Sequence, residues 1–349
     1  MSEEKDINER IDSIKLYYAD NSEVNATLVL EGGAFRGLYT AGVLDCLMDN
    51  KININNVLGI SAGGLNGANY VAGNRGRSAV GILKNRDNPR FVGVRAFMES
   101  GSIVGFKVMF EDFDEIQQLN EDRLFNSTRN LYVGCTNVET GELDYLSNHL
   151  GKETFFKALQ ATSSMPLLSS MVEIDGQHYL DGGCNSKFPI DFALEHNMKK
   201  IVVVSTRPLS YKRKEIPPEF FLERTFYNRY PKFIEALKRT NSKYNEDTLK
   251  IEEMASKGEL FLIEPSEPVD ISRLEKDVNK LVDLYELGYK DATNKMEALK
   301  TYLGLKEEIR ETEEKGIKAF FKRLFKKRKL ENTLYLIPKQ VKIQIEQIF

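Results

Sequence analysis

Two glycine-rich turns, each directly after an apolar run, constrain the fold of this chain most. Residues 27–37 are Thr-Leu-Val-Leu-Glu-Gly-Gly-Ala-Phe-Arg-Gly, and residues 57–63 are Val-Leu-Gly-Ile-Ser-Ala-Gly. A stretch with helical periodicity follows the first turn over residues 37–50, and residues 65–71 are expected to open a second helix. This repeated strand–turn–helix order predicts a parallel sheet with right-handed crossovers.

The second turn has the pattern Gly-x-Ser-x-Gly, centred on Ser61 and flanked by Gly59 and Gly63. A serine hydroxyl becomes a useful nucleophile only when a base takes its proton, and it must also be exposed. A sharp strand-to-helix turn exposes the side chain, and glycines on both sides let neighbouring backbone pass without a Cβ clash. The pattern alone recurs by chance, but after an apolar run it predicts that Ser61 is the nucleophile.

The first turn supplies the other half of an acyl-transfer site. The attacked ester carbonyl becomes an oxyanion, which requires preorganised hydrogen-bond donors. Gly32 and Gly33 are expected to turn their N–H groups inward, because glycine tolerates positive φ. Arg36 lies close to this turn and is expected to anchor it or to face a phosphate.

Asp181 is the candidate general base. It precedes Gly182 and Gly183, and it ends a predicted hairpin strand whose turn is Asp175-Gly176. An aspartate before two glycines is common in turns. Once Ser61 and the oxyanion turn are placed, however, a carboxylate on a tight loop is the natural base.

The chain contains three histidines, and none has flanks typical of a catalytic loop. His149 lies in a polar stretch, and His196 ends a predicted helix. His178 is three residues from Asp181, so its side chain is expected to point elsewhere. We therefore favour a Ser–Asp dyad. A Ser–His–Asp esterase that uses His196 remains the alternative enzyme.

These motifs, in this order, resemble the bacterial patatin-like phospholipase family. The resemblance spans residues 25–210 and rests on residues 32–37 (Gly-Gly-Ala-Phe-Arg-Gly), 59–63, 161–166 (Ala-Thr-Ser-Ser-Met-Pro) and 181–183 (Asp-Gly-Gly). It implies a three-layer α/β/α fold with a mainly parallel central sheet. It also implies a Ser61–Asp181 dyad that cleaves acyl esters of glycerolipids through an acyl-enzyme, without a metal or cofactor. Arg36, Gly37, Gly59, Gly63, Gly182 and Gly183 are then supporting motif positions.

The chain departs from the family at Ala34, where a third glycine is expected. If this residue must adopt positive φ, alanine costs about 1 kcal/mol or more. The N–H of Ala34 remains available, so Ala34 joins Gly32 and Gly33 as a candidate oxyanion donor.

The chain is predicted to divide into four parts. A polar lead-in covers residues 1–24, and the catalytic core covers residues 25–210. A helical part that packs on the core covers residues 211–310, and a basic tail covers residues 311–349. Further predicted elements are strands at 131–135, 143–146, 200–205 and 261–265, helices at 153–162 and 274–303, and a pocket or lid containing Phe91, Phe97, Phe106, Phe110 and Phe113.

The tail is basic and amphipathic. Residues 315–329 contain eight basic residues and no acidic one, and helical spacing places five apolar residues on one face: Ile317, Phe320, Phe321, Leu324 and Phe325. An aromatic face flanked by cations is typical of an interfacial helix on anionic lipid. We favour this interpretation over a helix that docks on the protein, and we expect no nucleic-acid partner.

Composition adds few constraints. The 349 residues, 41% of them hydrophobic, are enough for one large α/β domain and an appendage, and the net charge of −3 favours no particular partner. Cys46, Cys135 and Cys184 lack metal-like spacing and are expected to be buried thiols. No signal peptide or spanning segment is evident, so we expect a cytoplasmic protein, peripheral on the inner face of the membrane. A non-catalytic lipid-binding protein on the same fold is the alternative from another functional class.

Overall fold

A computed structural model describes residues 2–20, 22–214, 221–273 and 275–305. The chain divides into two units, residues 1–299 and residues 300–349. The fold and the site below belong to the first unit.

The core of this unit is an eight-stranded mixed sheet with the order β10-β9-β2-β3-β5-β8-β7, in which β6 also pairs with β5. The run from β10 to β5 is parallel, whereas β6, β7 and β8 pair antiparallel. The strands are β2 (Val24–Leu30), β3 (Ile54–Ile60), β5 (Asn130–Asn137), β6 (Leu143–Ser147), β7 (Val172–Ile174), β8 (Gln177–Asp181), β9 (Ile201–Val204) and β10 (Leu260–Ile263). A separate two-stranded sheet pairs β1 (Tyr17–Tyr18) with β4 (Asn74–Arg75).

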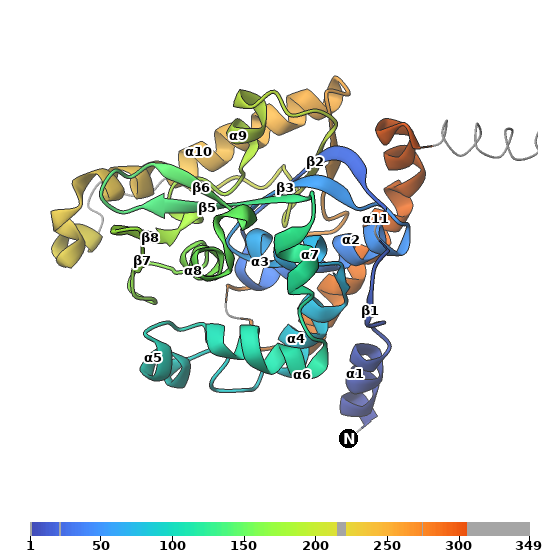
Figure 1. Cartoon of the computed structure of the whole chain (residues 1–349), viewed down its shortest axis with the longest axis horizontal. Helices are drawn as coiled ribbons and strands as arrows, with labels where there is room; N and C mark the ends of the chain where they lie inside the picture. Colours follow the sequence, from blue (N-terminus) through green and yellow to red (C-terminus); the bar gives the residue numbers. More distant parts are fainter. Residues whose placement is uncertain (1, 21, 215–220, 274, 306–349) are drawn as a thin grey trace, which may run out of the picture. The chain divides into compact units, whose positions relative to one another are not determined.

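Helices cover both faces of the sheet (Figure 1). One face carries α2 (Gly37–Asp49), α3 (Ala62–Val71) and α8 (Lys152–Ala161), and the other carries α9 (Ile190–Glu195) and α10 (Pro231–Ser256). The other α-helices are α1 (Ser2–Asp12), α4 (Arg77–Lys84), α5 (Val94–Ser100), α6 (Phe113–Ile116), α7 (Glu121–Asn126) and α11 (Val278–Leu303). Helix α11 lies against α2. The three-layer α/β/α prediction is confirmed.

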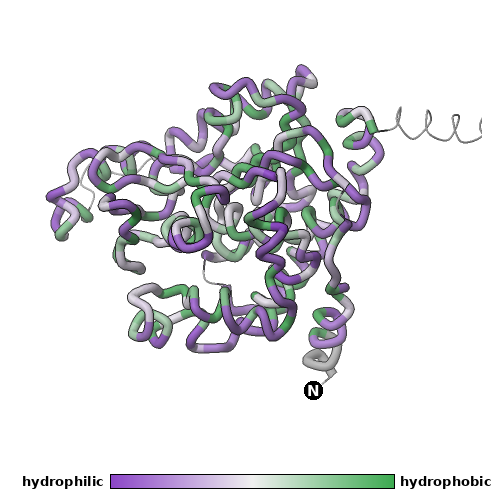
Figure 2. Tube along the Cα trace, viewed as in Figure 1, coloured by the Kyte–Doolittle hydropathy of each residue, from purple (hydrophilic) through white to green (hydrophobic). Residues whose placement is uncertain are grey.

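Alternation along the strands builds the two apolar layers. Val29 of β2 and Leu58 of β3 pack with Tyr244 and Ile251 of α10. Their neighbour Leu30 points the other way, toward Gly67 of α3. Figure 2 shows α10 as mainly hydrophilic with hydrophobic positions at intervals, as expected for a helix that buries one face.

The predicted elements are present, with shifts at their ends. The first strand begins at Val24 rather than at residue 27, because Val24 pairs with Ile54 before a register shift that precedes Thr27. The predicted hairpin of residues 131–135 and 143–146 is β5 with β6, and the predicted Asp175-Gly176 turn joins β7 to β8. The helix predicted over 274–303 begins at Val278. The sheet of β1 and β4 was not predicted.

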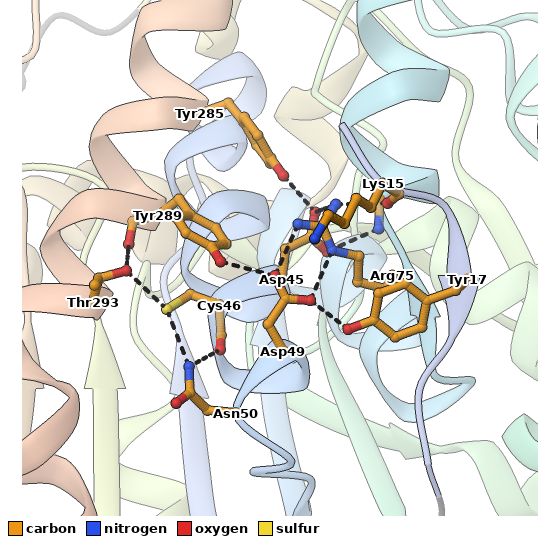
Figure 3. A network of polar contacts seen from close by, with 11 residues as sticks. Lys15, Tyr17, Asp45, Cys46, Asp49, Asn50, Arg75, Tyr285, Tyr289 and Thr293 are labelled. Atoms are coloured by element: carbon orange, nitrogen blue, oxygen red, sulfur yellow. Dashed lines mark hydrogen bonds and ion pairs between the residues drawn. The ribbon is translucent and has the colours of Figure 1, made fainter. Parts of the chain in front are cut away.

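A partly buried polar network ties α11 to α2 and to the N-terminal segment (Figure 3). Tyr285 of α11 donates a hydrogen bond to Asp45 Oδ2 over 2.8 Å, and Tyr289 donates to Asp49 Oδ2 over 2.9 Å. Arg75 forms an ion pair with Asp49 over 3.0 Å and donates to the Lys15 carbonyl. Burial raises the pKa of Asp45 to about 6, and Arg75 opposes that rise. The backbones of α2 and α11 also lie very close, because a Cβ placed on Gly42 would lie 2.1 Å from the Tyr285 carbonyl oxygen.

Candidate active site

Strand β5 brings two distant chain segments together along one of its edges. The parallel pairing of β3 with β5 ends at Ile60, opposite Gly134. The antiparallel pairing of β8 with β5 ends at Asp181, opposite the next residue, Cys135. Ser61, which follows β3, therefore meets Asp181, which ends β8.

Ser61 lies on a strained strand-to-helix turn. Its φ of 54° and ψ of −124° belong to a region that non-glycine residues rarely adopt, and α3 begins at the next residue. The turn requires close backbone approach, because a Cβ on Gly59 would lie 2.6 Å from the Gly63 carbonyl carbon. The N–H of Ser61 donates to Thr162 Oγ1 over 2.9 Å, and the Thr162 hydroxyl donates to the Gly134 carbonyl over 2.6 Å.

The Ser61 hydroxyl donates directly to the Asp181 carboxylate. The distance from Ser61 Oγ to Asp181 Oδ2 is 2.9 Å. The other carboxylate oxygen, Oδ1, accepts the N–H of Gly183 over 2.6 Å. Asp181 itself is only 7% exposed. Both oxygens of the carboxylate are thus held in a fixed direction, and one faces the serine.

The electrostatics of Asp181 favour a proton acceptor of raised basicity. Burial raises the pKa of Asp181 above its ordinary value. The Lys187 ammonium, the Gly183 N–H and the Ser61 hydroxyl oppose that rise. Lys187 Nζ also donates to the Gly183 carbonyl, so the cation holds the loop that carries the carboxylate.

The glycine-rich turn after β2 lies beside Ser61, and its three candidate donors differ. Gly32 N–H donates to the Lys187 carbonyl over 3.1 Å, which corrects the expectation that it is free for an oxyanion. A Cβ on Gly32 would lie 3.2 Å from Ser61 Cβ, so this glycine serves close approach. The N–H groups of Gly33 and Ala34 have no acceptor among the described residues. Ala34 adopts a φ of 49°, so the cost expected for alanine at positive φ applies.

Ser61 and Asp181 open into a cavity of about 510 Å³. Its lining is largely apolar and includes Leu65, Ile82, Phe91, Phe110, Phe113 and Leu119. Of the aromatic residues predicted to form a pocket or lid, Phe91, Phe110 and Phe113 line the cavity, whereas Phe106 is buried outside it and Phe97 is exposed. A cavity of this size and lining accommodates an acyl chain next to the serine.

A model of the patatin-like phospholipase family matches residues 28–194, which contain Ser61, Asp181 and the glycine-rich turn. Residues 28–194 are a patatin-like phospholipase domain. A second family model, a domain of unknown function (DUF6363), matches residues 230–304. The segment that carries α10 and α11 thus lies outside the patatin-like domain.

Two curated proteins are similar to the chain. The uncharacterized protein YjjU of Escherichia coli K12 is 27% identical over 271 residues, which cover 75% of this chain and 74% of YjjU. The probable lipid hydrolase 463L of Invertebrate iridescent virus 6 is 24% identical over 211 residues, which cover 54% of this chain and 72% of that protein. Among solved structures, VipD from Legionella pneumophila matches with a TM-score of 0.43 and 13% identity over 82% of this chain and 70% of that one.

The supporting motif positions of the patatin-like domain surround the same site. Gly37 begins α2, and its carbonyl accepts the Asn66 amide over 2.8 Å. Gly182 and Gly183 form the short turn that follows Asp181. Arg36 is 5% exposed and donates to the Ile271 carbonyl over 3.5 Å, so the motif arginine anchors a loop from outside the patatin-like domain.

The three histidines have partners elsewhere. His149 contacts Asn130, His178 contacts Glu139, and His196 contacts the Phe192 carbonyl. All three lie in described parts of the chain, and none of them lines the cavity. Nothing therefore stands between Ser61 and Asp181 as an intermediary base. The three cysteines are free and buried as predicted, and Cys184 lines the cavity.

The sequence did not indicate the roles of Thr162 and Lys187, which lie next to Ser61 and Asp181. Thr162 was noted only as part of a small-residue segment, because its two partners, the Ser61 N–H and the Gly134 carbonyl, are distant in the chain. No sequence pattern pointed to Lys187, because its proximity to Asp181 depends on how the chain turns after Gly183.

The basic tail falls outside the described residues, and so do the proposed membrane-facing positions Ile317, Phe320, Phe321, Leu324 and Phe325. Within residues 2–305, apart from the undescribed gaps, none of the helices combines the length and apolarity that crossing a membrane requires.

Proposed function

We propose that this protein is a serine lipid acyl hydrolase that cleaves acyl esters of glycerolipids through a Ser61–Asp181 dyad. The observation that carries the proposal is the direct 2.9 Å hydrogen bond from Ser61 Oγ to the buried Asp181 carboxylate, since both residues line a largely apolar cavity. The patatin-like phospholipase domain and the similarity to a probable lipid hydrolase support the same class of activity.

The chemistry follows from this geometry. Ser61 Oγ attacks the ester carbonyl carbon while Asp181 Oδ2 takes the hydroxyl proton. The N–H groups of Gly33 and Ala34 stabilise the oxyanion. The bond to the alcohol then breaks, Asp181 returns the proton to the leaving alcohol, and an acyl-enzyme remains. Asp181 next takes a proton from water, whose oxygen attacks the acyl-enzyme carbonyl. The bond to Ser61 Oγ then breaks, Asp181 returns the proton to Ser61 Oγ, and the fatty acid is released.

Membrane contact is a second part of the proposal. The eight basic residues within 315–329 favour binding to an anionic lipid surface. Exposed apolar side chains in the described part support it, because Leu167 and Leu168 line the cavity and are also exposed. The Leu168 carbonyl accepts a hydrogen bond from the Ile103 N–H, in the segment that follows α5. Val94 and Met98 of α5 are also exposed. A lipid surface that covers these side chains would deliver substrate to the cavity.

The test is labelling by a fluorophosphonate probe of wild-type protein, Ser61→Ala and Asp181→Asn. We expect labelling in the wild type, none in Ser61→Ala and strongly reduced labelling in Asp181→Asn. Ser163→Ala is the matched control, because Ser163 also lines the cavity and its Oγ has no partner in the described part of the chain. Labelling that survives in Ser61→Ala, or that disappears in Ser163→Ala alone, would refute the nucleophile assignment. A folded wild type that binds vesicles and remains unlabelled with them would favour a lipid-binding protein.

A further inference from the structure

Five cationic side chains of the described residues line the cavity, and one of them, Arg77, forms an ion pair with Asp114 over 2.6 Å. The other four are Arg36, Lys187, Arg213 and Arg273. They lie within electrostatic reach of one another, because Arg213 and Arg273 lower the pKa values of both Arg36 and Lys187. We call these four residues the cationic pole.

The cationic pole forms no ion pair with a described residue. None of its four residues has a carboxylate oxygen within 4.0 Å in the described part of the chain. Arg36 Nε and Arg213 Nε are buried and lack any hydrogen-bond partner there. Among the described residues of the cavity wall, Asp181 is the acidic one, and its carboxylate is already bound by Ser61 and Gly183. Asp181 and the buried Glu31 offset part of this positive charge, since their carboxylates act electrostatically on Lys187 and Arg36. The positive charge that remains in a partly dry cavity favours an anionic ligand.

The two arginines from outside the patatin-like domain are held in position. The Arg213 guanidinium stacks on the Tyr244 ring at 4.3 Å. Its backbone is fixed by Asn245, which accepts the Arg213 N–H over 2.8 Å and donates to its carbonyl over 2.9 Å. The loop before Arg273 is anchored by two carbonyl contacts, from Arg36 to Ile271 and from Arg207 to Val269.

The cavity is therefore chemically divided. Aromatic and aliphatic side chains from the patatin-like domain, including Phe91, Phe110 and Phe113, suit an acyl chain. The polar wall combines the cationic pole with Thr240 and Asn241 of α10. An ester whose acyl group occupies the apolar wall directs its alcohol part elsewhere, and the polar wall is the surface available to it.

We propose that the cationic pole binds a phosphate carried by the alcohol part of the substrate, so that the enzyme prefers glycerophospholipids with an anionic headgroup over zwitterionic ones. Guanidinium groups match phosphate oxygens in a two-pronged geometry, and a headgroup with its own cation meets repulsion from the pole. The preference rests on the proposed hydrolase function. It also assigns a role to the segment outside the patatin-like domain, because Arg213 and Arg273 complete the pole.

The test compares two phosphodiesters that differ in headgroup charge. The full chain is assayed with dihexanoyl phosphatidylglycerol and dihexanoyl phosphatidylcholine below their critical micelle concentrations, so that no lipid surface contributes. We expect kcat/KM to favour phosphatidylglycerol by about 10-fold or more. Arg213→Gln and Arg273→Gln, which lie on separate segments, should each move this ratio toward one. Arg229→Gln, at an exposed arginine outside the cavity wall, should leave it unchanged.

Equal rates on the two lipids, or a ratio that is unchanged in both pole variants, would overturn the proposal. Inorganic phosphate added to the assay separates a lipid headgroup from free phosphate. Strong inhibition by inorganic phosphate together with equal rates on the two lipids would assign the pole to free phosphate and overturn headgroup selection. A wild type that hydrolyses neither lipid nor p-nitrophenyl butyrate and takes no fluorophosphonate label would instead refute the hydrolase function itself.

Discussion

Ser61 Oγ lies 2.9 Å from Asp181 Oδ2, although 120 residues separate them in the chain. Strand β5 causes this proximity, since β3 and β8 approach each other along one of its edges and end at adjacent positions. The two groups are thus fixed by main-chain pairing rather than by a flexible loop. A site on paired strands is well suited to hold catalytic geometry.

Thr162→Val should disturb the turn that carries Ser61 while leaving Ser61 itself unchanged. The Thr162 hydroxyl accepts from the Ser61 N–H and donates to the Gly134 carbonyl, and valine leaves both groups buried without these partners. We expect a loss of about 2–4 kcal/mol in the free energy of unfolding and slower probe labelling. Urea denaturation and labelling kinetics measure the two effects. Thr162→Ser keeps the hydroxyl and should lose less, and equal losses in both variants would assign the effect to packing.

Ala34→Gly should relieve strain in the oxyanion turn. Alanine at a φ of 49° costs about 1 kcal/mol or more, and glycine removes this cost. Part of the stabilisation is lost, because glycine increases the conformational entropy of the unfolded chain. We expect the free energy of unfolding to rise by up to about 1 kcal/mol, with activity retained. Ala236→Gly within α10 is the opposite control and should lose about 1 kcal/mol. A decrease in stability for Ala34→Gly would contradict the strain argument.

The pH dependence of hydrolysis should report Asp181. A general base must be ionised, so kcat/KM should fall as the pH drops through the pKa of Asp181, which burial raises above 3.8. Lys187 opposes that rise, so Lys187→Met should raise the pKa further and move the acid limb to higher pH. Lys187→Arg retains the charge and should keep the limb near its original place. An acid limb that moves to lower pH in Lys187→Met would show that Lys187 does not lower the pKa of Asp181.

His196→Ala separates the dyad from a Ser–His–Asp triad. The His196 ring stacks on Phe192 and bonds to its carbonyl over 2.9 Å, at the end of α9 and outside the cavity wall. We expect kcat/KM within about 2-fold of the wild type, whereas a triad predicts a loss of about 1000-fold or more. The same assay on His149→Ala and His178→Ala completes the comparison. A large loss in any of the three would revive a histidine base.

Gly288→Ala should weaken the contact between α11 and α2. A Cβ on Gly288 would lie 2.1 Å from the Tyr39 carbonyl oxygen, so the helices must separate. We expect a loss of about 1–3 kcal/mol or more in the free energy of unfolding, measured by denaturant titration. Lys290→Ala, an exposed position on the same helix, should change stability by less than about 0.5 kcal/mol. Similar values for both variants would argue against close backbone packing.

Much of the local structure could be predicted from the sequence. Apolar runs, helical periodicity and turn residues depend on neighbours in the chain, so they indicated the main strands, the helices that follow them and the turn that presents Ser61. The order of the motifs also indicated the patatin-like fold. The sheet of β1 and β4 escaped prediction because two-residue strands carry too little pattern.

The amino-acid sequence specifies the residue types that the site can use: a serine between glycines, an aspartate before glycines, and an alanine where positive φ is strained. Which of these residues meet depends on the three-dimensional fold. The register of β5 joins Ser61 to Asp181, the Lys187 carbonyl occupies the Gly32 N–H, and the C-terminal segment brings Arg213 and Arg273 to the cavity. These contacts join residues that are far apart in the chain. They are brought together by strand pairing and helix packing, which cannot be read from a local sequence pattern.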